Sequence, residues 1–366
     1  MVFYLPLEPY VERYTWFMSS VNGWAETTMK DNNIPFKRVD GQKLGTSIKD
    51  GVVLDACGRS YYAMSQMMEL IRLINEGEVH NDDLIYLEDF WHPGVECLFY
   101  IRQMKKMKFK IGTFIHAQSI DDTDFSYAMR EWMRPIEQGY GTGYDYIFTC
   151  SYILRDLCIN NHIGTSKTVF KVGLPYNSKR LLEQLHEAGF KEEPKENYVV
   201  FASRFDDEKD PMFFLDVVES CPDIKFKLVN PRKDRPITSN QAVVDRLNKV
   251  LETCDNLELV DTSNKLKYYS TVQKAKVMFN CANQDWVSWT LLEGVTFGCH
   301  PLYPIWKDFP YELNYDRNYL YTKRDLEDCV AKLRKLMTKE FDPNLNYIVE
   351  FHDKSFLTYL KTMQGE

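Results

Sequence analysis

The sequence predicts two doubly wound α/β domains joined by one linker. At 366 residues it is long for a single hydrophobic core, and two domains of ordinary size suit that length. Short apolar runs alternate with segments of helical periodicity in two successive series, which is typical of parallel sheets covered by helices. Between the two series, residues 179–196 turn charged and include the run KEEPKE, so we place the domain boundary there.

The first series predicts an N-terminal domain over residues 1–180. Its strands are expected where apolar runs end at turn residues, at 2–7, 36–39, 51–56, 84–87, 109–115, 146–149 and 169–173. Helices are expected at 15–30, 62–76, 95–107 and after Ser151, a residue type that favours a helix N-cap. The three glycines at 139–143 are expected to form a loop that follows a helix.

The second series predicts a C-terminal domain over residues 197–345. Its strands are expected at 198–203, 224–229, 257–260, 277–279 and 301–303. Helices are expected at 211–220, 240–253, 266–275 and 323–337, with a short one after residue 288. Residues 346–366 are predicted to form a C-terminal helix that packs back on the first domain. The fold class is therefore two Rossmann-like domains.

Composition indicates a soluble protein of a reducing compartment. A net charge of −8 argues against a chain that binds polyanions over its whole surface, although one basic face is compatible with it. The nine cysteines are odd in number and form no C-x-x-C pair, which predicts reduced thiols and no structural zinc site. Glu8 and Glu12 come too early for a signal peptide, and no apolar run approaches the roughly 18 residues of a membrane span. We expect a cytoplasmic protein.

Residues 280–304 carry the first candidate site. The apolar run at 277–279 leads into a polar loop, a short helix, Gly298 and a second extended run. In parallel sheets, ligands bind beyond the carboxyl ends of the strands, where a helix start offers N–H groups to phosphate. Asp285 and Glu293 stand eight residues apart and flank that helix start and its second turn. In a chain with this many acidic residues, such a spacing often occurs by chance. The neighbouring residues therefore decide whether this pair marks a ligand site.

Arg204 and Lys209 carry the second candidate site. They stand five residues apart in the loop that follows the strand at 198–203. An arginine offers a planar fork and a lysine a point charge, a combination that suits a diphosphate. The alternative is a solvated charged loop. The carboxylate pair Asp285 and Glu293 on the same predicted sheet favours the ligand site.

Together these segments resemble the retaining nucleotide-sugar glycosyltransferases of GT-B fold. Those enzymes have an Arg-x-x-x-x-Lys loop, then an acidic residue and a glutamate with seven residues between them, then a glycine before the next strand. The resemblance covers essentially the whole chain, because YDYIFTCS and FKVGLPYN in the first domain also fit. It implies two domains that face each other across a cleft and a UDP-hexose or UDP-pentose as donor. It also implies an enzyme that requires no metal or other cofactor.

The resemblance also assigns roles to residues. It implies that Arg204 and Lys209 bind the donor diphosphate and that Glu293 binds the ribose hydroxyls. The phosphates would also meet backbone N–H groups at the helix start, from Ser288, Trp289 and Thr290. Asp285 stands where the family usually has a glutamate that faces the transferred sugar, so its reach is one methylene shorter. The family's glycine-rich loop of the first domain is not recognisable near residues 6–15.

Three segments resemble more narrowly the T-even phage DNA glucosyltransferases, which modify hydroxymethylcytosine. They are the strand that ends at His116, the stretch WTLLEGVTFGCHPLYPIWKD and the tail EFHDKSF. This resemblance implies double-stranded DNA with a modified cytosine as acceptor, and a monomer in the host cytoplasm. His116 would hydrogen-bond the sugar. Those enzymes carry an aspartate after the histidine, whereas this chain has Ala117, so Asp121 or Asp122 would have to substitute.

The predicted chemistry is stabilisation of an oxocarbenium-like centre while a nucleoside diphosphate leaves. In retaining enzymes of this fold the acceptor hydroxyl attacks from the leaving-group face. Candidates for contact with DNA phosphates are Arg130 and Arg134, together with the basic stretches 102–110 and 232–235. The aromatic residues Trp132 and Tyr140 are candidates for stacking on an extruded base.

Several alternatives remain open from the sequence alone. His116 is also compatible with a structural histidine at a strand end, and Asp122 with Asp124 could hold a metal ion as in the other glycosyltransferase fold. The acceptor could also be a small molecule or a cell-surface glycan. For a cell-surface glycan we would expect a membrane-facing amphipathic helix, and no convincing one is found in the first domain. A sugar-nucleotide sensor would bind the donor without turning it over. The residues do not name the transferred sugar.

Overall fold

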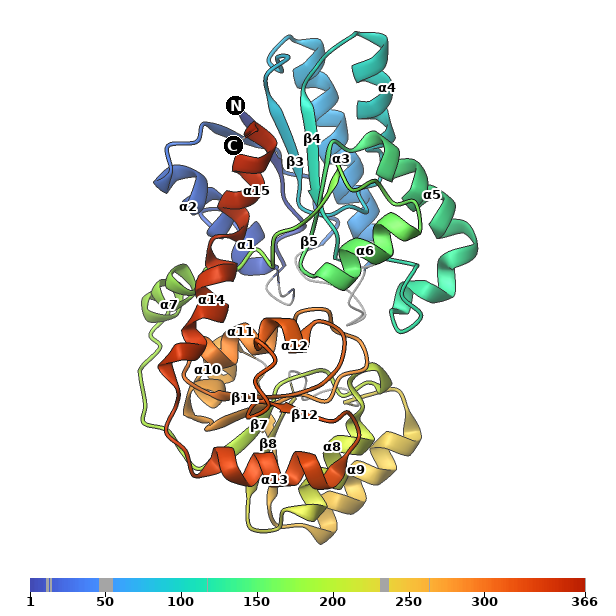
Figure 1. Ribbon diagram of the computed structural model, residues 1–366. Coiled ribbons are helices and arrows are strands. Elements are labelled where there is room, and N and C mark those ends of the chain that lie inside the picture. Colours follow the sequence, from blue (N-terminus) through green and yellow to red (C-terminus); the bar gives the residue numbers. More distant parts are fainter. Residues whose placement is uncertain are drawn as a thin grey trace. The chain divides into compact units, whose positions relative to one another are not determined.

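The computed structural model describes residues 1–10, 13, 15–45, 55–116, 118–230, 237–262 and 264–365. The chain divides into two compact units (Figure 1). The first unit is Met1–Asn177 with His352–Glu366, and the second is Ser178–Phe351. Each unit contains one sheet of six strands, and the strand pairs in both sheets are parallel. The prediction of two Rossmann-like α/β domains is confirmed.

The first sheet has the order β2-β1-β3-β4-β5-β6. Its strands are β1 (Val2–Leu5), β2 (Phe36–Arg38), β3 (Leu84–Leu87), β4 (Lys110–Phe114), β5 (Tyr146–Thr149) and β6 (Val169–Lys171). The helices of this unit are α1 (Trp16–Ser19), α2 (Trp24–Asp31), α3 (Ala56–Asn75), α4 (Glu96–Met104), η2 (Phe125–Met129), α5 (Arg130–Gly143), α6 (Tyr152–Asn160) and α15 (Ser355–Gln364). β1 and β3 are buried along their whole length, because this sheet is covered on both faces.

The C-terminal helix α15 packs on the first sheet. Figure 1 shows it beside α2, and the two helices are in contact. The ring of Tyr359 stacks on that of Phe148 at 4.5 Å and on that of Phe114 at 5.8 Å. The side chain of Met363 fills the space over Gly112, where a Cβ would lie 2.5 Å from its sulfur. Aromatic stacking and this close approach fix the end of the chain on β4 and β5.

The second sheet has the order β12-β11-β10-β7-β8-β9. Its strands are β7 (Tyr198–Phe201), β8 (Lys225–Asn230), β9 (Leu257–Asp261), β10 (Val277–Phe279), β11 (His300–Pro304) and β12 (Leu320–Tyr321). The helices are α7 (Ser178–Glu187), η3 (Asp207–Lys209), α8 (Pro211–Ser220), α9 (Gln241–Thr253), α10 (Lys265–Lys274), α11 (Trp289–Thr296), α12 (Phe309–Glu312), α13 (Leu326–Met337) and η4 (Pro343–Leu345). The next helix, α14 (Asn346–Asp353), begins in this unit and ends in the first. The strand order reverses between β7 and β10, the point where such sheets bind ligands. Among the described helices, none has both the length and the apolar character needed to cross a bilayer.

Most expected elements are present, and β3, β5, α8 and β10 have the bounds that the sequence predicts. The expected helix at 15–30 is instead two helices, α1 and α2. They are separated at Gly23, whose Cα packs so closely that a Cβ would lie 2.5 Å from the carbonyl oxygens of Phe17 and Met18. Residues 51–54 of one expected strand lie outside the described residues, and Asp55 caps α3 through a bond from the N–H of Gly58 at 2.9 Å. The sequence analysis missed α12 and β12, which are only four and two residues long.

The glycine-rich segment 139–143 is helical, which corrects the loop prediction. α5 continues to Gly143 because two of its glycines allow close packing of neighbouring groups. A Cβ on Gly141 would lie 2.5 Å from the backbone nitrogen of Gly164, and one on Gly143 would lie 2.3 Å from the ring of Phe99. Gly139 is exposed and has nothing within 4 Å of the corresponding position. These glycines therefore serve contact between elements rather than a turn.

We predict opposite effects for alanine at two of these positions. Gly141→Ala should lower the free energy of unfolding by about 1–3 kcal/mol, because the backbone at Gly164 must move to accept the methyl group. Gly139→Ala is the matched control in the same helix and should raise stability by about 0.5–1 kcal/mol, since alanine is the better helix former. Thermal unfolding of the two variants measures the difference. Equal shifts of both would contradict the packing role of Gly141.

Candidate functional site

The candidate site lies at the carboxyl edge of the second sheet, where β7 and β10 are neighbours. The strands pair in parallel with Val277 opposite Val199, so the loops that follow them leave from the same edge. The loop after β7 carries Arg204 and Lys209, and the loop after β10 carries Asp285. β8 and β9 lie on one side of this point and β11 and β12 on the other. The topology thus brings the two predicted motifs to one place.

An ion pair joins these two loops. The ammonium Nζ of Lys209 lies 2.9 Å from Asp285 Oδ1 and also donates to the backbone carbonyl of Gln284. The backbone N–H groups of Asn283 and Gln284 donate to the carbonyl of Glu208 at 2.8 and 3.1 Å. The side chain of Lys209 is only 8% exposed. With so little solvent to screen it, this pair holds the two loops together.

Arg204 is the more open of the two cations. Its guanidinium forms an ion pair with Glu208, four residues on, and its side chain is 45% exposed. Such an exposed pair contributes little to stability. A phosphate that approached this loop would compete with Glu208 for the guanidinium. The side chain is therefore placed to exchange a protein carboxylate for an anionic ligand.

The start of α11 contributes a chain of hydroxyl groups. Ser288 is the N-cap residue, yet its side chain makes no cap hydrogen bond. Instead Ser288 Oγ lies 2.8 Å from Thr290 Oγ1, which lies 3.0 Å from the phenol oxygen of Tyr303 on β11. Trp289 is the first residue of the helix. Backbone N–H groups at a helix start, with hydroxyl groups beside them, favour an anion.

Glu293 lies one turn further along α11 and is held by two tyrosines. The phenol groups of Tyr268 and Tyr269 on α10 donate to its two carboxylate oxygens at 2.5 and 2.8 Å. Burial raises the pKa of Glu293, and the two tyrosine hydrogen bonds act in the opposite direction. A carboxylate has about four acceptor positions, so it can also accept from the hydroxyls of a ligand. The sequence analysis missed both tyrosines, because no motif links them to Glu293.

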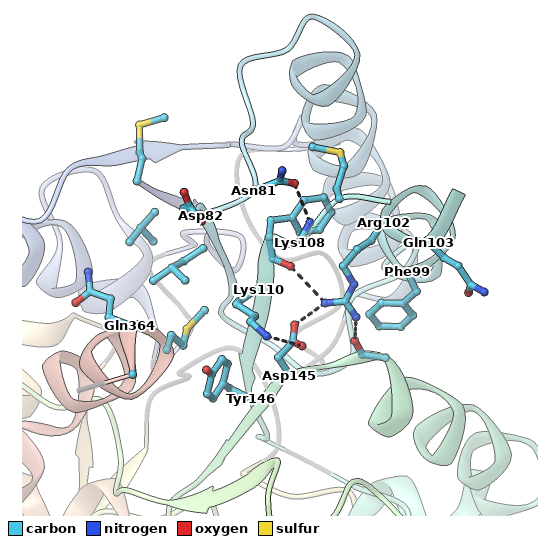
Figure 2. Close-up of a pocket in the computed structure, with 18 of the residues that line it drawn as sticks. Asn81, Asp82, Phe99, Arg102, Gln103, Lys108, Lys110, Asp145, Tyr146 and Gln364 are labelled. Carbon is cyan, nitrogen blue, oxygen red and sulfur yellow. Dashed lines mark hydrogen bonds and ion pairs between the residues drawn. The ribbon is translucent and has the colours of Figure 1, made fainter. Parts of the chain in front are cut away.

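A cavity of about 1130 Å³ lies elsewhere, at the amino ends of the strands of the first sheet. The first residues of strands line it, including Lys110 and Tyr146, together with Lys106 and Lys108 (Figure 2). Figure 2 also shows the ion pair of Arg102 with Asp145. The basic stretch 102–110 therefore sits at the edge opposite to the carboxyl ends from which His116 and Asp121 follow.

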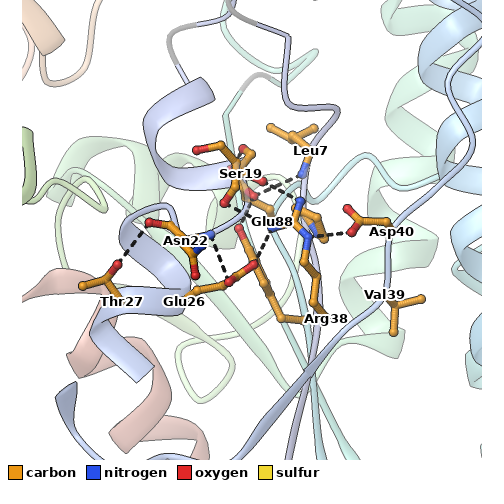
Figure 3. A network of polar contacts seen from close by, with 12 residues as sticks. Leu7, Ser19, Asn22, Glu26, Thr27, Arg38, Val39, Asp40 and Glu88 are labelled. Carbon is orange, nitrogen blue, oxygen red and sulfur yellow. Dashed lines mark hydrogen bonds and ion pairs between the residues drawn. The ribbon is translucent and has the colours of Figure 1, made fainter. Parts of the chain in front are cut away.

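A buried carboxylate organises the carboxyl edge of the first sheet. Glu88, which follows β3, accepts hydrogen bonds from the phenol of Tyr4, the N–H of Leu7 and the hydroxyl of Ser19 (Figure 3). Burial raises its pKa to about 7, against the opposing effect of these hydrogen bonds. Arg38 donates to the carbonyl of Ser19 at 2.7 Å, so Ser19 is fixed from both sides. This network holds the loop after β1 to β3.

His116 is held at the same carboxyl edge of the first sheet, next to Glu88. Its Nε2 lies 2.8 Å from the backbone carbonyl of Glu88, which makes Nε2–H the donor. Burial lowers the pKa of His116, so the ring is neutral at neutral pH, and the carboxylate that acts against this shift is Asp89. Asp89 is itself held by Arg59 at 3.2 Å and by the N–H of Trp91 at 3.2 Å. The sequence analysis missed Asp89, because it comes from another strand than His116.

The remaining candidates lie in the loop after β4 and on α5. Asp121 is buried and accepts from the N–H and the hydroxyl of Thr123, whereas Asp122 is exposed. Asp124 caps η2 by accepting from the N–H of Ser126 at 2.9 Å. Across the described part of the chain, no three side chains of His, Cys, Asp or Glu gather as a metal site would require.

The basic and aromatic candidates of α5 differ in exposure. Arg130 lies over the ring of Tyr127 at 4.4 Å, and Arg134 is half-buried one turn along. Trp132 is 54% exposed, whereas Tyr140 packs among Phe90, Phe99 and Trp91. The stretch 232–235 and Ala117 lie outside the described residues.

Comparison with solved structures identifies the fold. No protein-family model and no curated protein sequence matches the chain. Among solved structures it is similar to sucrose-phosphate synthase from Thermosynechococcus elongatus, with a TM-score of 0.63 and 10% identity over 100% of this chain and 96% of that one. It is also similar to an α,α-trehalose-phosphate synthase (UDP-forming) from Burkholderia xenovorans, with a TM-score of 0.56 and 12% identity over 82% and 73%.

A third similar structure is the GtfA/B complex, with a TM-score of 0.55 and 13% identity. That match covers 84% of this chain but only 62% of the neighbour, less than two thirds of its length. Identities this low establish likeness of fold alone. The chain has the GT-B fold, with two Rossmann-like units in succession.

Proposed function

We propose that this chain is a glycosyltransferase that moves a sugar from a nucleoside-diphosphate sugar to an acceptor hydroxyl. The observation that carries the proposal is the Lys209–Asp285 ion pair, which joins a basic loop to an acidic loop at the point where the strand order reverses. A nucleoside-diphosphate sugar needs both features at one place, cations for its phosphates and carboxylates for its hydroxyls. The UDP-forming synthase of similar fold supports a UDP-sugar as donor.

In this proposal the cations act on the leaving group. Arg204 exchanges Glu208 for a phosphate oxygen, and Lys209 adds a second positive charge beside it. The start of α11, at Ser288, Trp289 and Thr290, adds backbone N–H groups. These fixed charges and dipoles stabilise the diphosphate as its bond to the sugar breaks. They supply the positive charge that the leaving group needs, so the mechanism requires no metal ion.

The carboxylates act on hydroxyl groups. Glu293, oriented by Tyr268 and Tyr269, accepts from the ribose diol, and Asp285 faces the transferred sugar. With retention of configuration, the acceptor hydroxyl attacks from the face of the leaving group, and the departing phosphate takes its proton. This step forms a C–O bond to the acceptor as the bond to the diphosphate breaks.

For the acceptor, we propose 5-hydroxymethylcytosine in double-stranded DNA. The resemblance of three segments to phage DNA glucosyltransferases supports it, and one of these segments meets a segment of the wider resemblance in space. In FKVGLPYN the N–H of Leu174 donates to Nδ1 of His352 in EFHDKSF at 2.9 Å. We assign His116 to a hydrogen bond with the transferred sugar, and we assign the acceptor-binding role to Asp121, Asp122, Arg130 and Arg134. We propose that Asp89, whose charge raises the pKa of His116, serves in place of the aspartate that follows the histidine in those enzymes.

A donor and acceptor panel tests this function. UDP release is measured for several UDP-sugars with hydroxymethylated, plain and already glucosylated duplex DNA, and with glucose 6-phosphate as a non-nucleic acceptor. The proposal predicts turnover that depends on hydroxymethylated DNA. Turnover with the sugar phosphate alone would reject the DNA acceptor and keep the enzyme class. Donor binding with no turnover or hydrolysis under any condition would instead indicate a sensor.

We predict that loss of a cation and loss of a carboxylate from the site have different effects on the kinetics. Arg204→Ala should lower kcat by two or more orders of magnitude, because it removes a charge that acts on the leaving group and leaves Glu208 to repel it. Glu293→Ala should mainly weaken donor binding, by about 30-fold or more, because it removes the acceptor of the ribose hydroxyls. Steady-state kinetics and titration calorimetry with UDP separate the two effects.

The matched control is Arg246→Ala. Arg246 pairs with Asp216 and Glu219 on the surface formed by α8 and α9, so this variant loses the same charge and a comparable ion pair away from the site. Its kcat and donor affinity should equal those of the wild type. Wild-type kinetics in both Arg204→Ala and Glu293→Ala would reject the assignment of the site.

A further inference from the structure

A second cationic cluster lies on the same edge of the second sheet, beyond β11 and β12. Lys307 follows β11, and Lys323 and Arg324 follow β12. Two tryptophans accompany them, Trp286 from the loop after β10 and Trp306 from the loop after β11. We call these five residues the basic–aromatic surface. The donor site described above uses none of them.

Each lysine of this surface lies over an aromatic ring. Lys307 Nζ is 4.1 Å from the ring centre of Trp286, and Lys323 Nζ is 4.2 Å from that of Trp306. Lys323 Nζ also donates to the carbonyl of Ala282 at 3.1 Å, and the indole N–H of Trp306 donates to the carbonyl of Asn283 at 2.8 Å. These contacts fix the cations and rings in one arrangement before any ligand arrives.

The cations of the surface lie close enough to affect one another. Arg324 pairs with Asp210 at 2.7 Å, although its side chain is 63% exposed. Burial lowers the pKa of Lys323 to about 8, and the charges of Arg324 and Lys307 act in the same direction while Asp210 opposes them. An anion bound here would relieve this mutual repulsion.

Strain and unpaired donors accompany the cluster. Lys307 and Arg324 adopt left-handed backbone conformations, with φ of 46° and 60°, which non-glycine residues seldom do. The indole N–H of Trp286 and the amide nitrogen of Asn280 are buried and meet no acceptor within the described chain. Such features are costly and are characteristic of binding sites.

The ligand class follows from the alternation of cations and rings. Trp306 is 38% exposed, and two further exposed aromatic residues, Tyr311 and Tyr315, lie close by in sequence with their rings 5.2 Å apart. Cations that follow a phosphate backbone, together with open rings on which bases stack, are typical of surfaces that bind unpaired nucleic acid. A lone diphosphate would need the cations but not the rings.

We propose that the basic–aromatic surface binds the acceptor duplex where a nucleotide is extruded, with Lys323 and Arg324 on backbone phosphates and Trp306 stacked on the extruded base. This inference rests on the proposed function for the identity of the acceptor. It extends that function by placing nucleic-acid contacts in the second unit, beside the loops assigned to the donor.

The test is fluorescence anisotropy with a fluorescein-labelled hydroxymethylcytosine duplex over a range of NaCl concentrations. The double variant Lys323→Gln/Arg324→Gln should weaken binding at least tenfold and reduce the slope of log K against log salt by about 1.8, since two phosphate contacts to a duplex are lost. Trp306→Ala should weaken binding about tenfold with the slope unchanged, because stacking releases no counterions. UDP-sugar hydrolysis by the variants, measured without DNA, should stay at the wild-type rate.

The matched control is Arg246→Gln/Lys249→Gln, which removes two positive charges from α9. The proposal predicts little change in slope for this variant. A loss of slope in the control but not in Lys323→Gln/Arg324→Gln would overturn it. If the wild type hydrolyses the donor but binds no DNA, the surface assignment fails while the transferase proposal stands. If it does neither, the proposed function fails as well.

Discussion

The ion pair between Lys209 and Asp285 is the contact on which the arrangement of the second unit's ligand edge depends. Its two residues are 76 positions apart in the chain and meet only because β10 inserts beside β7. The backbone of Glu208 accepts from both Asn283 and Gln284, and the thiol of Cys281 donates to the carbonyl of Lys209 at 3.2 Å. The pair is therefore the polar centre of a set of contacts that fixes one loop against the other. A change at either residue would leave a poorly solvated charge and loosen both loops.

This edge concentrates positive charge on a chain whose net charge is −8. Arg204 is held by Glu208, Lys209 by Asp285 and Arg324 by Asp210, so each of these three cations is placed by a carboxylate of the protein itself. The exposed pairs are weak, and an incoming phosphate can replace the carboxylate at small cost. The corresponding edge of the first unit is different. There Glu88 is buried among hydrogen-bond donors, and it fixes His116 through its backbone carbonyl rather than offering charge to solvent.

The sequence was sufficient for elements whose own residues specify them. The runs that form β3, β5 and β10 are wholly or largely apolar and end in polar residues, and Ser151 caps α6 through the N–H of Leu154, as its residue type predicts. The predictions that were wrong concerned residues whose structure depends on contacts with distant parts of the chain. Gly141 looked like a loop residue because the backbone of Gly164, against which it packs, is not visible from local sequence. For the same reason the site residues that could be named were those with a fixed spacing along the chain, such as Arg204 and Lys209. Tyr268, Tyr269 and Asp89 reach their partners only through the fold.

The central claim is that the carboxyl edge at β7 and β10 binds a nucleoside diphosphate. Hydrogen–deuterium exchange, measured by mass spectrometry with and without saturating UDP, tests it most directly because it reports on every loop at once. The account predicts slower exchange in peptides that cover residues 203–210 and 281–293, and no change in residues 102–110, which line the cavity of the first unit. Slower exchange confined to residues 102–110, or none in residues 281–293, would contradict it.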